Sequence, residues 1–264
     1  MTEAVTVDVE NGVATLTLNR PDQRNALSVE MTGALLDAID DLEGHEEARC
    51  LVITGRGKTF CAGGDIDAMA ERMAGEVSLA ESVRHIQQDT SRAIRRVREF
   101  HLPTVAKLDG VAYGAGANLA IACDCVVASE DARISFGFRQ VGLAVDSGTS
   151  YLLPRVVGEN VAKELVFTGE LLDAERAADL GIFNHVYPTD SFEDEADSFV
   201  ERIASGPTVA LETSKRLVNQ GLESSFKEAV DDEASAQAAV FETGDHREGA
   251  NAFMEGREPE FEGH

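Results

Sequence analysis

The sequence predicts an α/β fold followed by a helical C-terminal region. Two strand-turn-helix units come one after the other, and each has glycines at the junction between strand and helix. Repetition of strand, turn and helix is typical of an α/β core. From about Pro207 onward the chain keeps helical spacing and shows no strand pattern. We therefore expect a core over residues 1–206 and a separate helical region over residues 207–264, packed on a neighbouring subunit.

The N-terminal segment predicts a β-hairpin and then a helix. Apolar and polar side chains alternate over residues 4–10 and 13–18, on either side of Asn11-Gly12, a dipeptide that favours a two-residue hairpin turn. After a polar loop, Ser28 stands where an N-cap is needed, and the helix that it begins ends at about Glu43.

Two glycine-rich loops each follow a predicted buried strand. The first, residues 55–66, comes after a strand over residues 49–54 and precedes a long helix over residues 78–99. The second follows a strand that starts at Pro103, and it leads into a helix of small residues that ends at about Cys123. Such a bend can serve only as a tight turn. It also presents free backbone N–H groups that attract an anion, or an oxygen that becomes negative during a reaction.

The remaining elements follow from the same patterns. Short strands are predicted over residues 126–129, 132–136 and 184–187. Helical spacing predicts helices over residues 149–156, 161–167, 174–180, 192–205, 208–220 and 226–241.

The charge balance excludes several classes of partner. The chain has 48 acidic and 23 basic residues, a formal net charge of −25, and only five of the basic residues are lysines. Such a surface repels nucleic acid and anionic lipid, so we expect neither as a partner. The composition fits an acidic bacterial protein in general, and we favour adaptation to high salt, where screening removes the self-repulsion. Thermal stability measured against KCl concentration distinguishes the two interpretations.

The sequence gives no indication of a membrane segment, a signal peptide, a disulfide or a metal site. No apolar run is long enough to cross a bilayer, and the N-terminus lacks a basic region, so we expect a soluble cytoplasmic protein. The cysteines, Cys50, Cys61, Cys123 and Cys125, lack paired C-x-x-C spacing. We expect reduced, structural thiols.

The two glycine loops together resemble a known family. The run Phe60-Cys61-Ala62-Gly63-Gly64-Asp65-Ile66 and the run from Gly110 to Ala120, about fifty residues later, are similar to those of the enoyl-CoA hydratase/isomerase (crotonase) superfamily. The match extends through Leu153-Pro154-Arg155 to Arg247-Glu248-Gly249 near the C-terminus. Within the family, the pattern is closest to the epoxyphenylacetyl-CoA isomerase branch of phenylacetate breakdown. The resemblance implies a spiral of β-β-α units, a C-terminal helical region that forms trimers or paired trimers (hexamers), and an acyl-CoA thioester as substrate.

The resemblance also implies where the substrate binds. The thioester carbonyl oxygen would lie between the backbone N–H groups of Gly64 and Ala115. Fixed donors stabilise the negative charge that this oxygen gains when a neighbouring proton is removed, and each is worth on the order of 3 kcal/mol. The coenzyme A moiety would contact Gln23, Arg24, Ala62, Asp65 and Ile66. For Arg24, pairing with a phosphate and simple solvation remain alternatives. No metal or redox cofactor is implied, because coenzyme A is part of the substrate.

The residues at the family's acid and base positions favour an isomerase. Hydratases of this family hold a water between two glutamates, and the aligned positions here are Asn118 and Gln140, which cannot ionise. Asp146 matches the aspartate that some isomerase branches use, and one carboxylate suffices to move a proton between two carbons. An apolar pocket would raise its pKa. Asp146 could instead cap the following helix.

Two of these positions keep alternatives. Asn118 either orients the substrate or satisfies local backbone groups, and Gln140 is expected to line the pocket. The preferred activity is a Δ3-to-Δ2 double-bond shift or the rearrangement of a ring-modified acyl-CoA. The competing functions are an atypical hydratase in which Asp146 handles the water, and a catalytically silent acyl-CoA-binding protein.

Overall fold

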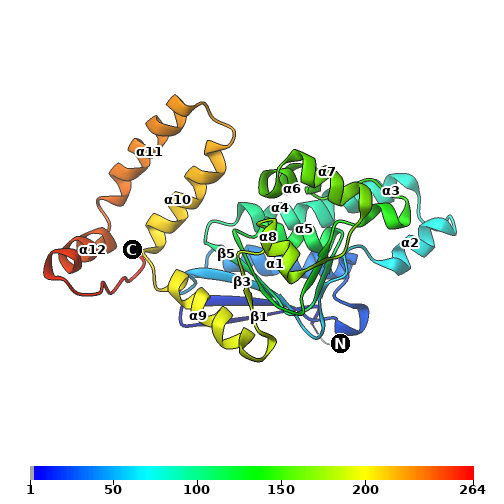
Figure 1. Ribbon diagram of the computed structural model, residues 1–264, viewed down its shortest axis with the longest axis horizontal. Helices are drawn as coiled ribbons and strands as arrows, with labels where there is room; N and C mark the ends of the chain where they lie inside the picture. Colours follow the sequence, from blue (N-terminus) through cyan, green and yellow to red (C-terminus); the bar gives the residue numbers. More distant parts are fainter. Residues whose placement is uncertain (1–2) are drawn as a thin grey trace.

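The computed structural model describes residues 3–264, and it shows an α/β core from which a helical arm projects (Figure 1). The larger sheet has the strand order β1-β2-β3-β5-β7-β10, and the smaller has the order β4-β6-β8-β9. The larger sheet consists of β1 (Val5–Glu10), β2 (Val13–Leu18), β3 (Cys50–Gly55), β5 (Thr104–Leu108), β7 (Cys125–Ser129) and β10 (His185–Tyr187). The smaller consists of β4 (Thr59–Cys61), β6 (Val111–Tyr113), β8 (Arg133–Ser135) and β9 (Leu172–Asp173).

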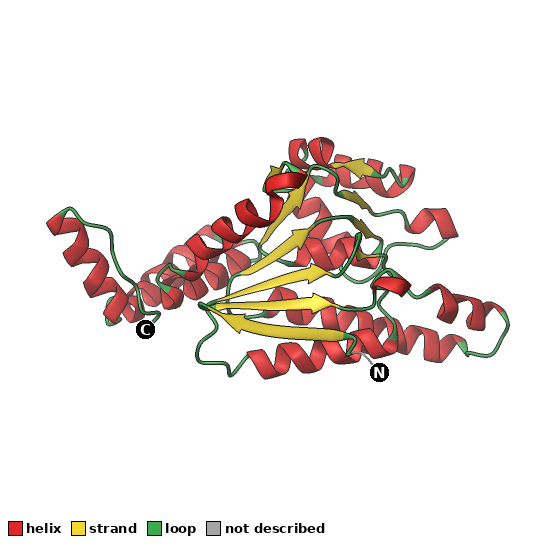
Figure 2. Cartoon of the chain, turned by 90° about the horizontal axis from the view of Figure 1, so that it is seen from below, coloured by secondary structure: helices red, strands yellow, loops and turns green. Residues whose placement is uncertain are grey.

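From β3 to β8, consecutive strands alternate between the two sheets. β3, β5 and β7 are parallel neighbours in the large sheet, and β4, β6 and β8, which follow them along the chain, are parallel neighbours in the small sheet. A helix completes each of these units of two strands. Repeated β-β-α turns of this kind form the expected spiral, and Figure 2 shows the fan of the large sheet with helices along it.

The helices of the core surround these sheets. They are α1 (Val29–Leu42), α2 (Ile66–Met73), α3 (Leu79–Arg84), α4 (Ser91–Glu99), α5 (Ala115–Ala122), α6 (Thr149–Val157), α7 (Glu159–Thr168), α8 (Ala174–Asp179) and α9 (Phe192–Ala204). Every residue of α5 is buried, so this helix runs through the main hydrophobic core. The other face of the large sheet is covered by α9, whose Phe192, Ala196 and Val200 pack against Val52 and Val105.

Local sequence signals placed several of these elements correctly. The hairpin turns at Asn11 and Gly12, both with positive φ, and Ser28 accepts a hydrogen bond from Met31 N as the N-cap of α1. The expected long helix is divided: residues 85–90, between α3 and α4, form a π-helix. Helix α2 and strands β4, β6 and β9 were not predicted, because they are short and lie in glycine-rich or polar stretches.

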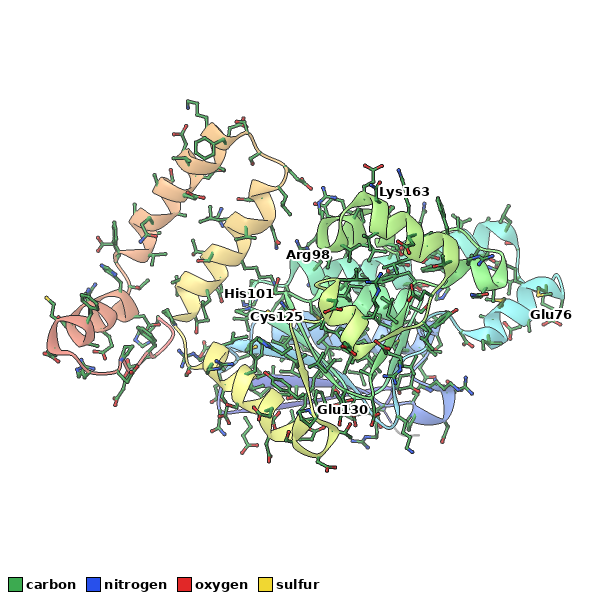
Figure 3. All side chains as sticks on the ribbon, viewed as in Figure 1. Glu76, Arg98, His101, Cys125, Glu130 and Lys163 are labelled. Atoms are coloured by element: carbon green, nitrogen blue, oxygen red, sulfur yellow. The ribbon has the colours of Figure 1, made fainter. Side chains whose placement is uncertain are left out.

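The arm consists of α10 (Thr208–Gly221), α11 (Phe226–Val240) and α12 (Gly244–Glu255). Two basic residues attach it to the core. Lys215 Nζ lies 2.7 Å from Asp124 Oδ2 and donates to Leu102 O, while Arg49 donates to Gly206 O and Thr208 Oγ1. Figure 3 shows Arg98, His101 and Cys125 on the side of the core that faces α10.

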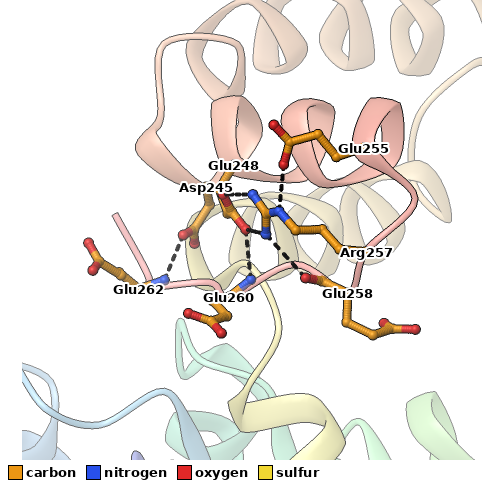
Figure 4. Close-up of polar contacts among 7 residues, drawn as sticks. All are labelled: Asp245, Glu248, Glu255, Arg257, Glu258, Glu260 and Glu262. Carbon is orange, nitrogen blue, oxygen red and sulfur yellow. Dashed lines mark hydrogen bonds and ion pairs between the residues drawn. The ribbon is translucent and has the colours of Figure 1, made fainter.

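The last residues of the chain fold back onto α12, which the sequence analysis did not predict. Asp245 accepts hydrogen bonds from Glu262 N and Gly263 N, and Glu248 pairs with Arg257 (Figure 4). Beyond these contacts the arm exposes large apolar side chains, among them Phe226 and Phe253. The C-terminal segment is therefore bonded to the rest of the arm, but the arm leaves apolar surface uncovered.

Candidate active site

The two glycine-rich loops touch each other at positions that only glycine fits. Gly63 has φ +86°, and a Cβ there would lie 2.4 Å from Tyr113 O. A Cβ on Gly116 would lie 2.2 Å from Cys61 O. Real Cβ atoms do not approach other atoms so closely, so each glycine allows the backbone of one loop to reach the other. Loops that are about fifty residues apart in the chain thus form one structural unit.

This contact places the backbone of Gly63 beside the start of α5, because a Cβ on Gly63 would lie 3.2 Å from Ala115 N. Ala115 is the first residue of α5, and the first N–H groups of a helix have no partner within it. Leu27 N donates to Gly63 O at 2.8 Å, and Leu27 pairs with Gly64 as an isolated parallel bridge. The Gly63 C=O and the Gly64 N–H belong to one trans peptide group and point in opposite directions, so the Gly64 N–H points away from Leu27. Within residues 3–264 neither N–H group donates a hydrogen bond.

Asp146 lies in the loop before α6, and one oxygen of its carboxyl group is unsatisfied. Oδ1 is buried and has no hydrogen-bond partner within the described chain. Burial raises the pKa of Asp146 above its usual 3.8, and a hydrogen bond with Ser147 opposes the rise. The carboxyl group does not cap the helix, because the N-cap of α6 is Gly148 and no side chain bonds there. The helix-cap interpretation of Asp146 is therefore wrong.

Asn118 holds the backbone of Asp146. Its side chain is fully buried on α5, one turn after Ala115. Nδ2 donates to Asp146 O at 2.9 Å, and Oδ1 accepts from Thr149 Oγ1 at 2.8 Å. These partners lie 28 and 31 residues away in the chain, so the bonds are not to local backbone groups, and a role in orienting the substrate stays a prediction. One helix thereby carries a free donor at Ala115 and fixes the residue that carries the acid.

Gln140 lies on a 3-10 helix, Phe138–Val141, and is exposed. Its Nε2 would be 2.9 Å from a Cβ on Gly169, so the side chain lies over that glycine. The adjacent Phe138 ring is buried, 3.9 Å from where a Cβ on Gly114 would stand. An aromatic ring therefore borders the second glycine loop, which the sequence analysis did not identify.

The residues expected to contact coenzyme A gather at the first glycine loop. Arg24 O accepts a hydrogen bond from Ala62 N at 3.0 Å, and this bond joins the segment of Gln23 and Arg24 to the loop that continues into Asp65 and Ile66. Gln23 and Arg24 are exposed, and Ile66 is 73% exposed at the start of α2. They form an open surface beside the Gly64 donor.

The side chain of the buried Asn25 joins the segment around Arg24 to the first glycine-rich loop. Its Nδ2 donates to Arg56 O and Thr59 O, and its Oδ1 accepts from Arg20 N. The sequence analysis assigned no role to Asn25. A polar residue buried between two loops has no local sequence signal, because its acceptors on Arg56 and Thr59 are 31 and 34 residues away.

The structure bears on the state of the cysteines, on metal binding and on membrane-spanning helices. All four cysteines are free, and burial raises the pKa of Cys50 and Cys61 to about 12, so these thiols stay protonated. Among residues 3–264, no three His, Cys, Asp or Glu side chains are grouped so as to hold a metal ion. No helix within that range has the length and apolar character needed to span a membrane.

Comparison with known proteins places this geometry in a family. The family model described as enoyl-CoA hydratase/isomerase matches residues 8–264. A Thermus thermophilus protein provisionally named an enoyl-CoA hydratase is 42% identical over 260 residues, covering 97% of this chain and 100% of that protein. The 1,2-epoxyphenylacetyl-CoA isomerase of Escherichia coli K12 is 34% identical over 264 residues, and both chains are fully covered.

A solved structure agrees. The crystal structure of an enoyl-CoA hydratase from Bacillus anthracis superposes with a TM-score of 0.92 at 30% identity, covering 99% of this chain and 100% of that chain. Sequence, fold and the meeting of the two glycine loops give the same answer: the chain belongs to the enoyl-CoA hydratase/isomerase (crotonase) superfamily.

Proposed function

We propose that the protein is an acyl-CoA isomerase that moves a double bond from Δ3 to Δ2, or rearranges a ring-modified acyl-CoA, with Asp146 as the proton shuttle. One observation carries the proposal. The buried Asp146 Oδ1 has no hydrogen-bond partner within residues 3–264, and Asn118 holds its residue against the helix that begins at the Ala115 N–H. A carboxyl oxygen kept free of partners remains available to a substrate.

In the proposed reaction, the Asp146 carboxylate removes a proton from C2 of a 3-enoyl-CoA. The C–H electron pair enters the π system and gives a dienolate, whose oxygen is stabilised by the Gly64 and Ala115 N–H groups. Asp146 then returns the proton to C4, and the double bond lies between C2 and C3. The raised pKa of Asp146 supports both steps, because acid and base forms are most useful near the working pH.

An atypical hydratase is the alternative, and the hydratase names of two of the relatives favour it. In that reaction Asp146 would deliver water across the double bond of a 2-enoyl-CoA. Neither Asn118 nor Gln140 can supply a second ionisable group. A catalytically silent acyl-CoA-binding protein is the third candidate.

One assay separates the three. Purified protein is given 3-hexenoyl-CoA and, separately, 2-hexenoyl-CoA. The isomerase converts the first to the second with a gain of conjugated absorbance, whereas a hydratase removes the absorbance of the second and forms 3-hydroxyhexanoyl-CoA. Turnover of neither, or turnover that persists in Asp146→Ala, contradicts the proposed mechanism.

Binding and assembly complete the proposal. Gln23 and Arg24 hold the nucleotide, Ala62, Asp65 and Ile66 surround the adenine, and no metal or redox cofactor takes part. The exposed apolar side chains of residues 207–264 pack on neighbouring subunits in a homotrimer or hexamer in the cytoplasm. Sedimentation analysis of the purified protein tests the assembly, and a monomer at micromolar concentration contradicts it.

A further inference from the structure

An open cavity of about 350 Å³ lies on the outer face of the helical stretch that precedes β5, where Gln87, Gln88, Arg92 and Arg95 are exposed. All the residues that line it have polar side chains: Gln87, Gln88, Ser91, Arg92 and Arg95. The first two belong to the π-helical segment, and the other three belong to α4. π-Helical turns are uncommon and often occur at functional sites.

A hydrogen bond joins this cavity to the active site. Ser91 Oγ donates to Ser147 Oγ at 3.3 Å, and Ser147 is the neighbour of Asp146 in the chain. Ser147 is buried and has φ +47°, a conformation that costs a non-glycine residue energy. Through Ser91 the cavity therefore adjoins Ser147, the residue next to Asp146.

The cavity is basic in a protein that is otherwise acidic. Residues 84–98 contain five arginines and one acidic residue, whereas the whole chain carries a net charge of −25. Arg96 and Arg98, which do not line the cavity, have acidic partners on neighbouring segments. Arg92 has no ion pair within residues 3–264, and Arg95 has only a 3.7 Å contact with Glu99 on the exposed surface.

We propose that this cavity receives the end of the acyl group remote from the thioester, and that the preferred substrates carry a carboxylate there. This inference rests on the proposed function. Two guanidinium groups without strong partners can bind a carboxylate through paired, charge-assisted hydrogen bonds. A purely alkyl chain would instead remove water from these charges and return nothing. Gln87 and Gln88 offer further donors beside the two arginines.

Binding tests the inference without requiring turnover. Calorimetry compares adipoyl-CoA with hexanoyl-CoA, and suberoyl-CoA with octanoyl-CoA, at one ionic strength. The members of each pair differ only in the remote carboxylate. Affinity should be about tenfold higher for the diacid derivative, as expected for one charge-assisted contact. Equal affinities in both pairs, or tighter binding of the alkyl thioesters, overturn the inference.

Variants locate the effect. Arg92→Gln with Arg95→Gln should abolish the preference for the diacid thioesters and leave the affinity for hexanoyl-CoA unchanged. Arg84→Gln removes one charge from the same stretch outside the cavity lining, and it should keep the preference. A preference that survives in the double variant, with circular dichroism showing an intact fold, assigns the carboxylate to another site and overturns the inference.

Turnover distinguishes this inference from the proposed function. With 3-hexenedioyl-CoA and 3-hexenoyl-CoA, the ratio of kcat/KM values should follow the binding preference and fall to about one in the double variant. Diacid binding without turnover of either substrate contradicts the isomerase proposal and leaves the inference about the cavity standing. Turnover of both at equal kcat/KM contradicts the inference and leaves the isomerase standing.

Discussion

Two aspartates near the starts of helices show how differently this chain uses the same side chain. Asp245, in the first turn of α12, is 4% exposed and accepts hydrogen bonds from the backbone of Glu262 and Gly263 at 2.8 and 3.0 Å (Figure 4). Asp146, just before α6, has a buried Oδ1 that accepts none within the described chain. The first carboxylate fixes the chain end, whereas the second bonds the neighbouring Ser147 and keeps Oδ1 free. A buried carboxyl oxygen without a partner costs stability, and that cost marks a group kept for chemistry.

The largest expected effect comes from exchanging each aspartate for asparagine. Asp146→Asn removes the proton shuttle and should lower the isomerisation rate about 10³-fold, a typical contribution of a general acid-base group. Asp245→Asn weakens the binding of the chain end and should leave turnover of 3-hexenoyl-CoA within about twofold, while lowering the melting temperature. Steady-state kinetics and thermal unfolding of both variants measure the contrast. Equal losses of activity would erase the distinction drawn between the two carboxyl groups.

The next effect concerns the contact between the glycine loops. Gly63→Ala places a Cβ against Tyr113 O and must displace the loop that carries the Gly64 N–H, so the rate should fall about 10²-fold. Gly75→Ala is the matched control, because Gly75 also has positive φ but a Cβ there meets nothing within 4 Å. Kinetics of the two variants separate loop contact from backbone strain. A loss in Gly75→Ala as large as in Gly63→Ala would refute the donor geometry.

A smaller effect is expected where the arm joins the core. The Lys215 side chain is 9% exposed and reaches Asp124 and Leu102 O. Lys215→Met leaves Asp124 without its close cation and should lower the free energy of unfolding by about 2 kcal/mol. Lys227→Met, on an exposed i,i+4 pair with Asp231, should change it by less than about 0.5 kcal/mol. Urea unfolding of both variants gives the comparison, and similar values would mean that Lys215 does not anchor the arm.

The smallest effect is a pH-dependent gain in stability for Asp146→Asn. The folded-state pKa of Asp146 is raised by burial, so ionisation of this group opposes folding. In the unsubstituted protein this penalty is absent below the usual pKa of 3.8 and grows as pH rises through the folded-state pKa. The asparagine variant should therefore be the more stable at neutral pH, and the gain should vanish as pH falls toward 3.8. A gain independent of pH would point to packing instead of ionisation.

Much of the fold could be predicted from local signals. Asn11-Gly12 fixed the hairpin, Ser28 fixed the start of α1, and Pro207 marked the beginning of the arm, because each acts on residues within one or two turns. The length and division of the helix over residues 78–99 could not be predicted, because a π-helical segment depends on packing against α1. Helix α12 was missed because its stability depends on the chain end that folds onto it.

The sequence by itself determined the family and the identity of the candidate acid, because glycines at loop junctions and a carboxylate at one position are readable residue by residue. Only the tertiary structure decided what Asn118 and Asp146 do. Asn118 binds the backbone of a residue 28 positions away, and Asp146 Oδ1 is left without a hydrogen-bond partner within residues 3–264, neither of which any local pattern encodes. Hydrogen-bond satisfaction and burial are properties of packed neighbours distant in the chain, and so the chemistry of the site depends on folding.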